Sequence, residues 1–316
     1  PGYLIGGVPL NFTVSARLGE SKYFVIEADE YDRSFLKLHP NVIAITAMDP
    51  DHLDIYGTAE EMEKSFIEFT GNLKEDGLLI TRKGLKREQD LIASHHITYQ
   101  LQNIEANVYC SNLKIVNGSY CFDVQGTDWT IDNLRLNMGG MHNVENSLVA
   151  ISVAKHLGIE NEKIRSALDA FLGVKRRFEF IVKSNDFVYI DDYAHHPEEL
   201  RALISGVRAL YPTQKITIVF QPHLFTRTRD LSIEFAQSLD LADEIWLLPI
   251  YPARELPIEG VSNKMVADLM KKNVKLIAKE EVLTLLTEEM PTLFLTAGAG
   301  DIDKLIQPIK EKMTLS

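Results

Sequence analysis

Residues 188–197 read VYIDDYAHHP, and this stretch sets the pattern for the whole chain. Its first three residues form an apolar run, which predicts a strand. Polar residues follow at once, and a proline at position 197 predicts the start of a helix. A strand that leads directly into a helix is typical of βαβ units in a mainly parallel sheet. Because ligands bind at the carboxyl ends of such strands, the polar residues are candidates for a site.

Similar alternation extends in both directions from this stretch. Further strands are predicted at 23–26, 42–45, 77–80, 216–220, 244–248 and 293–296, and helices at 58–73, 141–157, 161–171 and from 197 onward. Between about 106 and 136 the pattern changes, and turns at Asn117-Gly118 and Gly126-Thr127 predict antiparallel hairpins. We therefore predict an α/β protein with a small antiparallel β insert in its first part and a Rossmann-like second part, joined near 174–180.

Length and composition agree with two domains and exclude several classes of protein. At 316 residues the chain exceeds what one hydrophobic core comfortably supports. The balance of 33 Lys and Arg against 45 Asp and Glu gives a net charge of −12, which argues against nucleic acid or an anionic membrane as partner. Two cysteines, Cys110 and Cys121, exclude a disulfide scaffold and indicate a reducing compartment, although one bridge between them stays open. No apolar run reaches the roughly 18 residues of a membrane span.

Acidic residues follow the first two predicted strands, at 27–32 and 49–54. If those strands are neighbours, a carboxylate such as Glu27 and an imidazole such as His52 can share one divalent cation. Hard oxygen ligands with phosphate nearby favour Mg²⁺ or Mn²⁺. The alternative is a pair of solvated acidic turns, which are common in an acidic protein.

Three other polar clusters are candidate sites. Residues 191–196 offer carboxylates, a phenol and imidazoles for sugar hydroxyls, proton transfer or a metal, or they simply cap a helix. Residues 221–230 include Arg227 and Arg229, which can clamp a carboxylate or phosphate or form surface ion pairs. Asn143 and Asn146 share one helix face and can read a base edge or cap the helix. The TAGAGD sequence at 296–301 is a weak dinucleotide signal and predicts a tight strand-to-helix turn.

Taken in order, these motifs resemble the Mur ligase family. The matching stretches are 16–19 (ARLG), 27–30, 51–54, 140–146 (GMHNVEN), 176–178, 191–197, 221–230 and 251–253. The resemblance implies an ATP-dependent ligase of peptidoglycan synthesis in the bacterial cytoplasm. In that reaction ATP phosphorylates the carboxylate of UDP-N-acetylmuramate, and the amino group of L-alanine attacks the acyl phosphate.

The resemblance also implies a role for individual residues. Glu27 and His52 correspond to Mg²⁺ ligands, and together with Arg177, a phosphate contact, they form the catalytic set. The expected nucleotide contacts are Asn143, Asn146, Arg177 and Asp192, with Asp192 on the ribose. The expected amino-acid contacts are Tyr193, His195 and Arg227. Residues 1–176 then represent the latter part of a central ATP- and Mg²⁺-binding domain, and 177–316 a C-terminal amino-acid-binding domain.

Two departures from the family pattern limit these expectations. The phosphate-cradling loop of the G-x-x-G-K-[ST] type is absent. We expect it, and a domain that holds the UDP group, to precede Pro1, so the chain alone is predicted to be inactive. At Leu224 many relatives carry Arg, which leaves the amino-acid specificity open. The alternatives are a recycling ligase that joins a tripeptide to UDP-N-acetylmuramate, a non-catalytic nucleotide-binding module, and, on Gly298 and Gly300 alone, a nicotinamide-dependent dehydrogenase.

Overall fold

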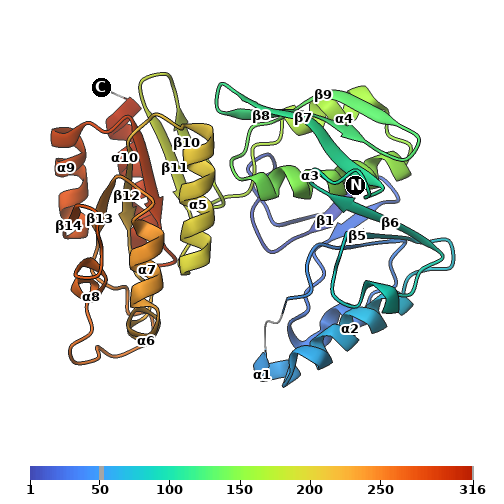
Figure 1. The fold of residues 1–316 in the computed structure, drawn as a ribbon, viewed down its shortest axis with the longest axis horizontal. Coiled ribbons are helices and arrows are strands. Elements are labelled where there is room, and N and C mark those ends of the chain that lie inside the picture. The colour runs from blue at the N-terminus through green and yellow to red at the C-terminus, as the bar shows by residue number, and fades with distance from the viewer. Residues whose placement is uncertain (50–52, 315–316) are drawn as a thin grey trace. The chain divides into compact units, whose positions relative to one another are not determined.

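The computed structural model describes residues 1–49 and 53–314, and the chain divides into two compact units (Figure 1). Unit 1 comprises residues 1–8, 12–137 and 141–171. Unit 2 comprises residues 9–11, 138–140 and everything from 172 onward. Backbone contacts hold the short 9–11 segment in unit 2, since the Leu10 N–H donates to the Gly173 carbonyl at 3.0 Å.

A six-stranded sheet forms the larger part of unit 1, in the order β4-β5-β6-β7-β8-β9. Its strands are β4 (Val42–Ile45), β5 (Leu78–Arg82), β6 (His95–Gln100), β7 (Val108–Val116), β8 (Ser119–Gln125) and β9 (Thr130–Leu136). Strands β4 to β7 are parallel, and β7 to β9 are antiparallel. The predicted antiparallel hairpins are thus confirmed, and they extend the parallel sheet along its edge.

The turn between β7 and β8 has the conformation that its sequence predicts. Asn117 and Gly118 both have positive φ, 50° and 66°. Two consecutive left-handed residues form the type I′ turn, whose twist matches that of the flanking strands. The Asn-Gly pair therefore fixes the register of this hairpin.

Helices of unit 1 are α1 (Leu53–Tyr56), α2 (Ala59–Gly71), α3 (Met141–His156) and α4 (Asn161–Asp169), with 3₁₀ turns η1 (Tyr31–Lys37) and η2 (Glu88–Asp90). Helix α2 begins after Thr58, whose hydroxyl accepts a hydrogen bond from the Glu61 N–H at 3.3 Å. Phe69 of α2 packs with Phe35 of η1 in a cluster that includes Ile43 of β4. This core holds the carboxyl edge of the parallel strands in place.

A separate three-stranded sheet has the order β2-β1-β3, with β1 (Gly2–Leu4), β2 (Ala16–Arg17) and β3 (Phe24–Ile26). It confirms the strand predicted at 23–26 but places it outside the six-stranded sheet. Its apolar side chains are unusually exposed, with Phe24 at 49%, Val25 at 54% and Leu18 just beyond β2 at 86%. Exposed apolar residues that gather on one small sheet are a candidate contact surface.

Unit 2 is built on a second six-stranded sheet, in the order β10-β11-β15-β12-β13-β14. Its strands are β10 (Glu179–Lys183), β11 (Val188–Asp192), β12 (Ile216–Phe220), β13 (Glu244–Leu247), β14 (Val274–Leu276) and β15 (Leu293–Ala297). All neighbouring pairs are parallel except β10 and β11. The predicted strands at 188–190, 216–220, 244–248 and 293–296 are confirmed as β11, β12, β13 and β15.

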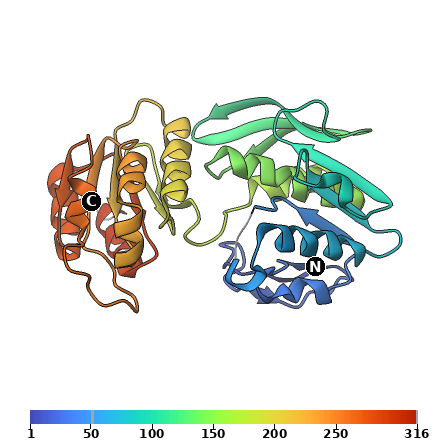
Figure 2. The same cartoon turned by 60° about the horizontal axis from the view of Figure 1, so that its bottom comes forward.

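Helices cover both faces of this sheet, as in a doubly wound α/β fold (Figures 1 and 2). They are α5 (Pro197–Leu210), α6 (Phe225–Asp230), α7 (Ser232–Leu239), α8 (Asn263–Ala267), α9 (Val282–Glu289) and α10 (Ile306–Thr314), with 3₁₀ turns η3 (Lys279–Glu281) and η4 (Asp301–Leu305). Tyr189, Trp246 and Phe294 pack beneath α9 and α10. The fold class predicted from the sequence is therefore correct. Among the described helices, none has the length and apolarity that crossing a membrane requires.

Candidate functional site

Asp191 is the last fully buried side chain of β11, and its contacts are structural. Its Oδ2 lies 2.9 Å from Arg176 Nε, and its Oδ1 accepts a hydrogen bond from the Thr296 hydroxyl at 2.6 Å. Arg176 also donates to the Gly298 carbonyl at 2.7 Å. Burial raises the pKa of Asp191 to about 6, although Arg176 and Thr296 act in the opposite direction. Asp191 thus ties the ends of β11 and β15 to the loop that begins unit 2.

Asp192, the expected ribose contact, is held rigidly at the strand end. Its Oδ2 accepts the Phe178 N–H and its Oδ1 accepts the Ala194 N–H, both at 2.7 Å. Burial raises the pKa of Asp192 to about 6, and the two backbone hydrogen bonds partly offset this rise. A carboxylate oxygen can accept two hydrogen bonds, so each oxygen of Asp192 has capacity left for a sugar hydroxyl.

The two adjacent histidines differ in their surroundings. His196 caps α5, and the N–H groups of His195 and His196 donate to Glu199 Oε2 at 2.8 and 3.0 Å. The His195 ring instead lies between two others, with centroid distances of 5.2 Å to Tyr193 and 6.0 Å to His223. Helix capping therefore accounts for His196, whereas Tyr193 and His195 belong to an aromatic cluster.

Arg177 lies in a loop whose backbone is strained on both sides. Arg176 and Phe178 have φ values of 57° and 48°. Phe178 packs so closely on Gly139 that a Cβ there would lie 1.9 Å from its ring. This packing turns Arg176 toward Asp191 and leaves Arg177 exposed, without an ion-pair partner in the described part of the chain. An exposed guanidinium beside Asp192 is available for a phosphate.

The segment after β12 is joined to the loop at 251–255. Leu224 N–H donates to the Tyr251 carbonyl at 3.0 Å, and Tyr251 N–H donates to the Pro222 carbonyl at 2.8 Å. The Thr226 N–H and hydroxyl both donate to the Glu255 carboxylate. Arg229 forms a surface ion pair with its neighbour Asp230, with Nε and Oδ1 2.7 Å apart. Of the two roles considered for these arginines, surface ion pairing therefore describes Arg229.

Glu27 follows β3 and is exposed. One of its oxygens accepts the Gly6 N–H at 2.6 Å, and a Cβ at Gly6 would touch the carboxylate at 3.4 Å. A hard carboxylate oxygen suits Mg²⁺ or Mn²⁺. His52 lies outside the described residues. The expectation that β3 and β4 are neighbours in one sheet is wrong in the described part of the chain, because β3 pairs with β1.

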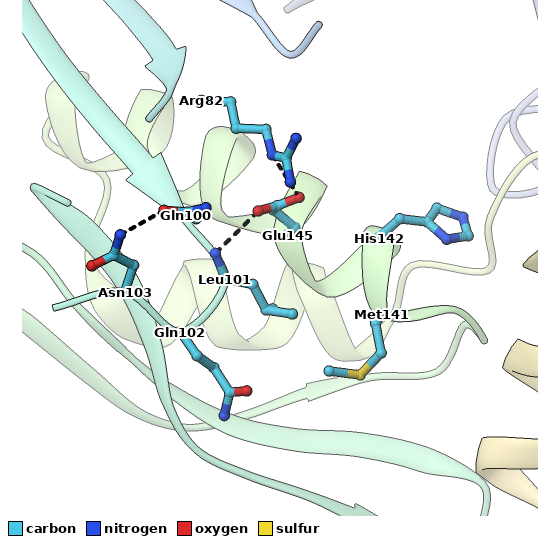
Figure 3. Close-up of a pocket in the computed structure, with 8 residues that line it drawn as sticks. All are labelled: Arg82, Gln100, Leu101, Gln102, Asn103, Met141, His142 and Glu145. Atoms are coloured by element: carbon cyan, nitrogen blue, oxygen red, sulfur yellow. Dashed lines mark hydrogen bonds and ion pairs between the residues drawn. The ribbon is translucent and has the colours of Figure 1, made fainter. Parts of the chain in front are cut away.

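A pocket of about 380 Å³ opens at the carboxyl ends of β5 and β6 (Figure 3). The residues that line it are Arg82, Gln100, Leu101, Gln102, Asn103, Met141, His142 and Glu145. Glu145 accepts the Leu101 N–H at 3.1 Å and pairs with Arg82 Nε at 3.2 Å.

Sequence reasoning missed this pocket. Asn143 and Asn146 lie on the same helix, α3, but do not line it. Arg82 ends β5, two residues beyond the strand predicted at 77–80, so the strand-end argument could have found it. Gln100 ends a strand that was not predicted.

Comparison of the sequence with known protein families shows the family to which this chain belongs. Residues 7–154 match the family model described as Mur ligase middle domain, and residues 176–300 match the one described as Mur ligase, glutamate ligase domain. The chain belongs to the Mur ligase family.

Within the family, the chain is similar to enzymes of one name. The chain is 44% identical to a UDP-N-acetylmuramate–L-alanine ligase of Cytophaga hutchinsonii, over 97% of this chain and 66% of the relative. It is 43% identical to the ligase of the same name from Flavobacterium psychrophilum, over 98% of this chain and 67% of the relative. The chain thus spans about two thirds of the length of these relatives.

The structure of UDP-N-acetylmuramate–alanine ligase from Thermotoga maritima matches with a TM-score of 0.82 at 25% identity, covering 99% of this chain and 69% of that one. A murein peptide ligase from Psychrobacter arcticus shares the fold at a TM-score of 0.57 and 22% identity, over 99% of this chain and 71% of that one.

Proposed function

We propose that this chain is part of a bacterial cytoplasmic enzyme that joins L-alanine to the carboxylate of UDP-N-acetylmuramate, with ATP as the phosphoryl donor. The observation that carries the proposal is a pair of arginines in unit 2 of a chain of net charge −12. Arg177, in the loop before β10, is exposed, and Arg227, in α6, has a buried Nη1 without a hydrogen-bond partner among the described residues. Relatives named for this reaction support it at 40–44% identity.

The residues suit a reaction that must first activate a carboxylate. A carboxylate is a poor acyl donor, and transfer of the ATP γ-phosphoryl group makes it an acyl phosphate that the alanine amine can attack. Arg177 is placed to neutralise charge on the transferring phosphoryl group. Asp192 holds the ribose, and Asn143 and Asn146 contact the adenine.

Glu27 and His52 would hold Mg²⁺. When bound, the cation neutralises negative charge on the phosphate oxygens. Glu27 is kept in place by the Gly6 N–H and stays exposed on its other side. Substituting Glu27 with Gln should raise the Mg²⁺ concentration needed for half-maximal activity.

The remaining parts of the site belong to a segment beyond these residues. We propose that residues 1–176 form the latter part of a central domain and 177–316 an amino-acid-binding domain, and that a preceding part carries the phosphate loop and binds the UDP group. The exposed apolar sheet β2-β1-β3 supports a covering segment, and the greater length of the relatives provides one. The 316-residue chain alone should then be inactive.

A tripeptide ligase is the second candidate, since a protein of that kind shares the fold. The test uses the protein extended to the length of its relatives, with L-alanine and the tripeptide in competition. We expect ATP-dependent phosphate release that requires both UDP-N-acetylmuramate and L-alanine. Preference for the tripeptide would overturn the assignment, and no phosphate release with either acceptor would favour a non-catalytic nucleotide-binding protein.

A further inference from the structure

Residues 5–15 form a loop that starts and ends in unit 1 but has its tip in unit 2, and we call this loop the strap. The Ile5 N–H donates to the Ser15 carbonyl at 3.0 Å, which closes the base of the strap. The tip, residues 9–11, belongs to unit 2. The strap is therefore a chain segment through which one unit can act on the other.

The side of the strap that returns from the tip is held against β1. The Tyr3 hydroxyl donates to the Val14 carbonyl at 3.0 Å, and the Tyr3 and Phe12 rings have centroids 5.5 Å apart. Between these contacts, Thr13 has a φ of 63°. A positive φ is rare for a β-branched residue and persists only where the surrounding contacts impose it. The path of the strap is thus fixed by its contacts.

The tip of the strap, residues 9–11, pairs with the segment that begins unit 2. The side-chain oxygen of Asn11 accepts a hydrogen bond from the Leu172 N–H at 2.9 Å. An antiparallel bridge between Pro9 and Val174 continues the pairing on the backbone. Because Asn11 is exposed, its contribution here is a hydrogen bond and little burial of apolar surface.

Val174 connects the tip of the strap to Arg177. It forms a second antiparallel bridge, with Arg177, whose N–H donates to the Val174 carbonyl at 3.1 Å. On the other side of Arg177, the Phe178 N–H donates to Asp192 Oδ2 at 2.7 Å. The backbone of Arg177 is therefore held from both sides, and the strap supports one of the two.

We propose that the strap positions Arg177 for contact with phosphate, with Asn11 as a positioning residue at its tip. This inference rests on the proposed function, in which Arg177 acts on the transferring phosphoryl group. The Arg177 side chain is exposed, so its location depends on the backbone that carries it. A misplacement of about 1 Å can lower a reaction rate about 100-fold, so a distant hydrogen bond can affect catalysis.

The first test uses the protein extended to the length of its relatives. Asn11→Ala removes the acceptor for the Leu172 N–H, so amide hydrogen exchange across 172–177 should become about 3- to 10-fold faster, the effect of one hydrogen bond. The value of kcat/KM for ATP should fall by a similar factor, while the melting temperature should change by less than about 4 °C. Asn11→Asp keeps an oxygen acceptor and should restore both the exchange rate and kcat/KM.

The second test asks whether Asn11 acts through Arg177. In an Arg177→Ala background, Asn11→Ala should cause no further loss of kcat/KM for ATP, because the group that it positions is gone. Asn107→Ala is the matched control, since it removes an exposed oxygen that accepts the Thr98 N–H at 2.8 Å within unit 1. This control should leave both the ATP kinetics and the exchange at 172–177 unchanged.

Equal losses from Asn11→Ala in the wild-type and Arg177→Ala backgrounds would overturn the positioning role. Unchanged exchange at 172–177 would overturn it as well, while the activity of the wild-type protein still supports the ligase. If the wild-type protein releases no phosphate from ATP, the proposed function fails and the role of Asn11 with it. Asn11→Gln, which moves the acceptor by one methylene group, gives the answer if Asn11→Ala does not fold.

Discussion

Arg176 and Asp191 form an ion pair in which the carboxylate is completely buried and the guanidinium nearly so. The Asp191 side chain is 0% exposed and that of Arg176 is 13% exposed, and the distance from Arg176 Nε to Asp191 Oδ2 is 2.9 Å. The neighbouring Arg177 is exposed. Adjacent arginines thus differ: Arg176 is structural, and Arg177 is the one that we propose contacts phosphate.

Breaking the buried pair should destabilise the protein. Asp191→Asn leaves the Arg176 guanidinium without a counter-charge, and we expect the free energy of unfolding to fall by about 3 kcal/mol at pH 7, measured by urea denaturation. Asp268→Asn removes an exposed partner of Lys264 and should change it by less than about 1 kcal/mol. Equal effects of the two substitutions would contradict the structural role of Asp191.

Substitution of Arg176 should lower stability, whereas substitution of Arg177 should lower activity. Arg177→Ala removes an exposed cation, so the melting temperature should hardly change, while kcat/KM for ATP should drop about 10- to 100-fold. Arg176→Ala should lower the melting temperature by several degrees, which corresponds to a loss of about 2–3 kcal/mol of unfolding free energy. If Arg177→Ala leaves the ATP kinetics intact, Arg177 does not contact phosphate.

Gly139 should tolerate no side chain. A Cβ would meet the Phe178 ring at 1.9 Å, so Gly139→Ala must displace the ring next to Arg177. Overpacking of this kind costs about 1–3 kcal/mol of unfolding free energy. Gly71→Ala, at the end of α2, meets only Ile92 at 3.7 Å and is the matched control, with no loss expected.

Glu244 should give a pH-dependent contribution to stability. Burial alone would raise its pKa, but hydrogen bonds from Lys215, Trp246 and Lys275 outweigh burial and lower the pKa to about 2. The folded state therefore binds the proton less tightly than the unfolded state. The stabilisation is complete above the ordinary value of 4.5 and is lost as the pH falls toward 2.

Substitution tests this linkage directly. Glu244→Gln should lower the unfolding free energy by about 1–3 kcal/mol at pH 6, and the difference from wild type should shrink at pH 3. Urea denaturation at both pH values measures it. Glu162→Gln, at an exposed position, should show little change at either pH. A difference that is constant with pH would show that Glu244 acts through packing alone.

Much of unit 2 could be predicted because its strands are continuous apolar runs. Ile216–Phe220 and Leu293–Ala297 are fully buried, as central parallel strands are. By contrast, β6 begins with His95 and His96 and has little apolar pattern to reveal it. The strands β1 and β2 are only three and two residues long, too short for any periodicity.

Candidate site residues could be named from the sequence for a similar reason. Asp192 and Arg227 are candidates because each follows a recognisable strand, and their roles stay predictions. It could not tell that Arg176 faces the core, because the choice between neighbours depends on the positive φ at 176 and 178. Pairings across the chain, such as His223 with Tyr251, were also beyond sequence reasoning, since they require the two loops to be in place.

We propose that an acyl phosphate forms on UDP-N-acetylmuramate, and isotope transfer tests its formation most directly. The protein, extended to the length of its relatives, is supplied with ATP, L-alanine and UDP-N-acetylmuramate in which both carboxylate oxygens are ¹⁸O. Amine attack on the acyl phosphate expels phosphate with one carboxylate oxygen. We predict one ¹⁸O in each phosphate released, by mass spectrometry, and phosphate without ¹⁸O would contradict the account.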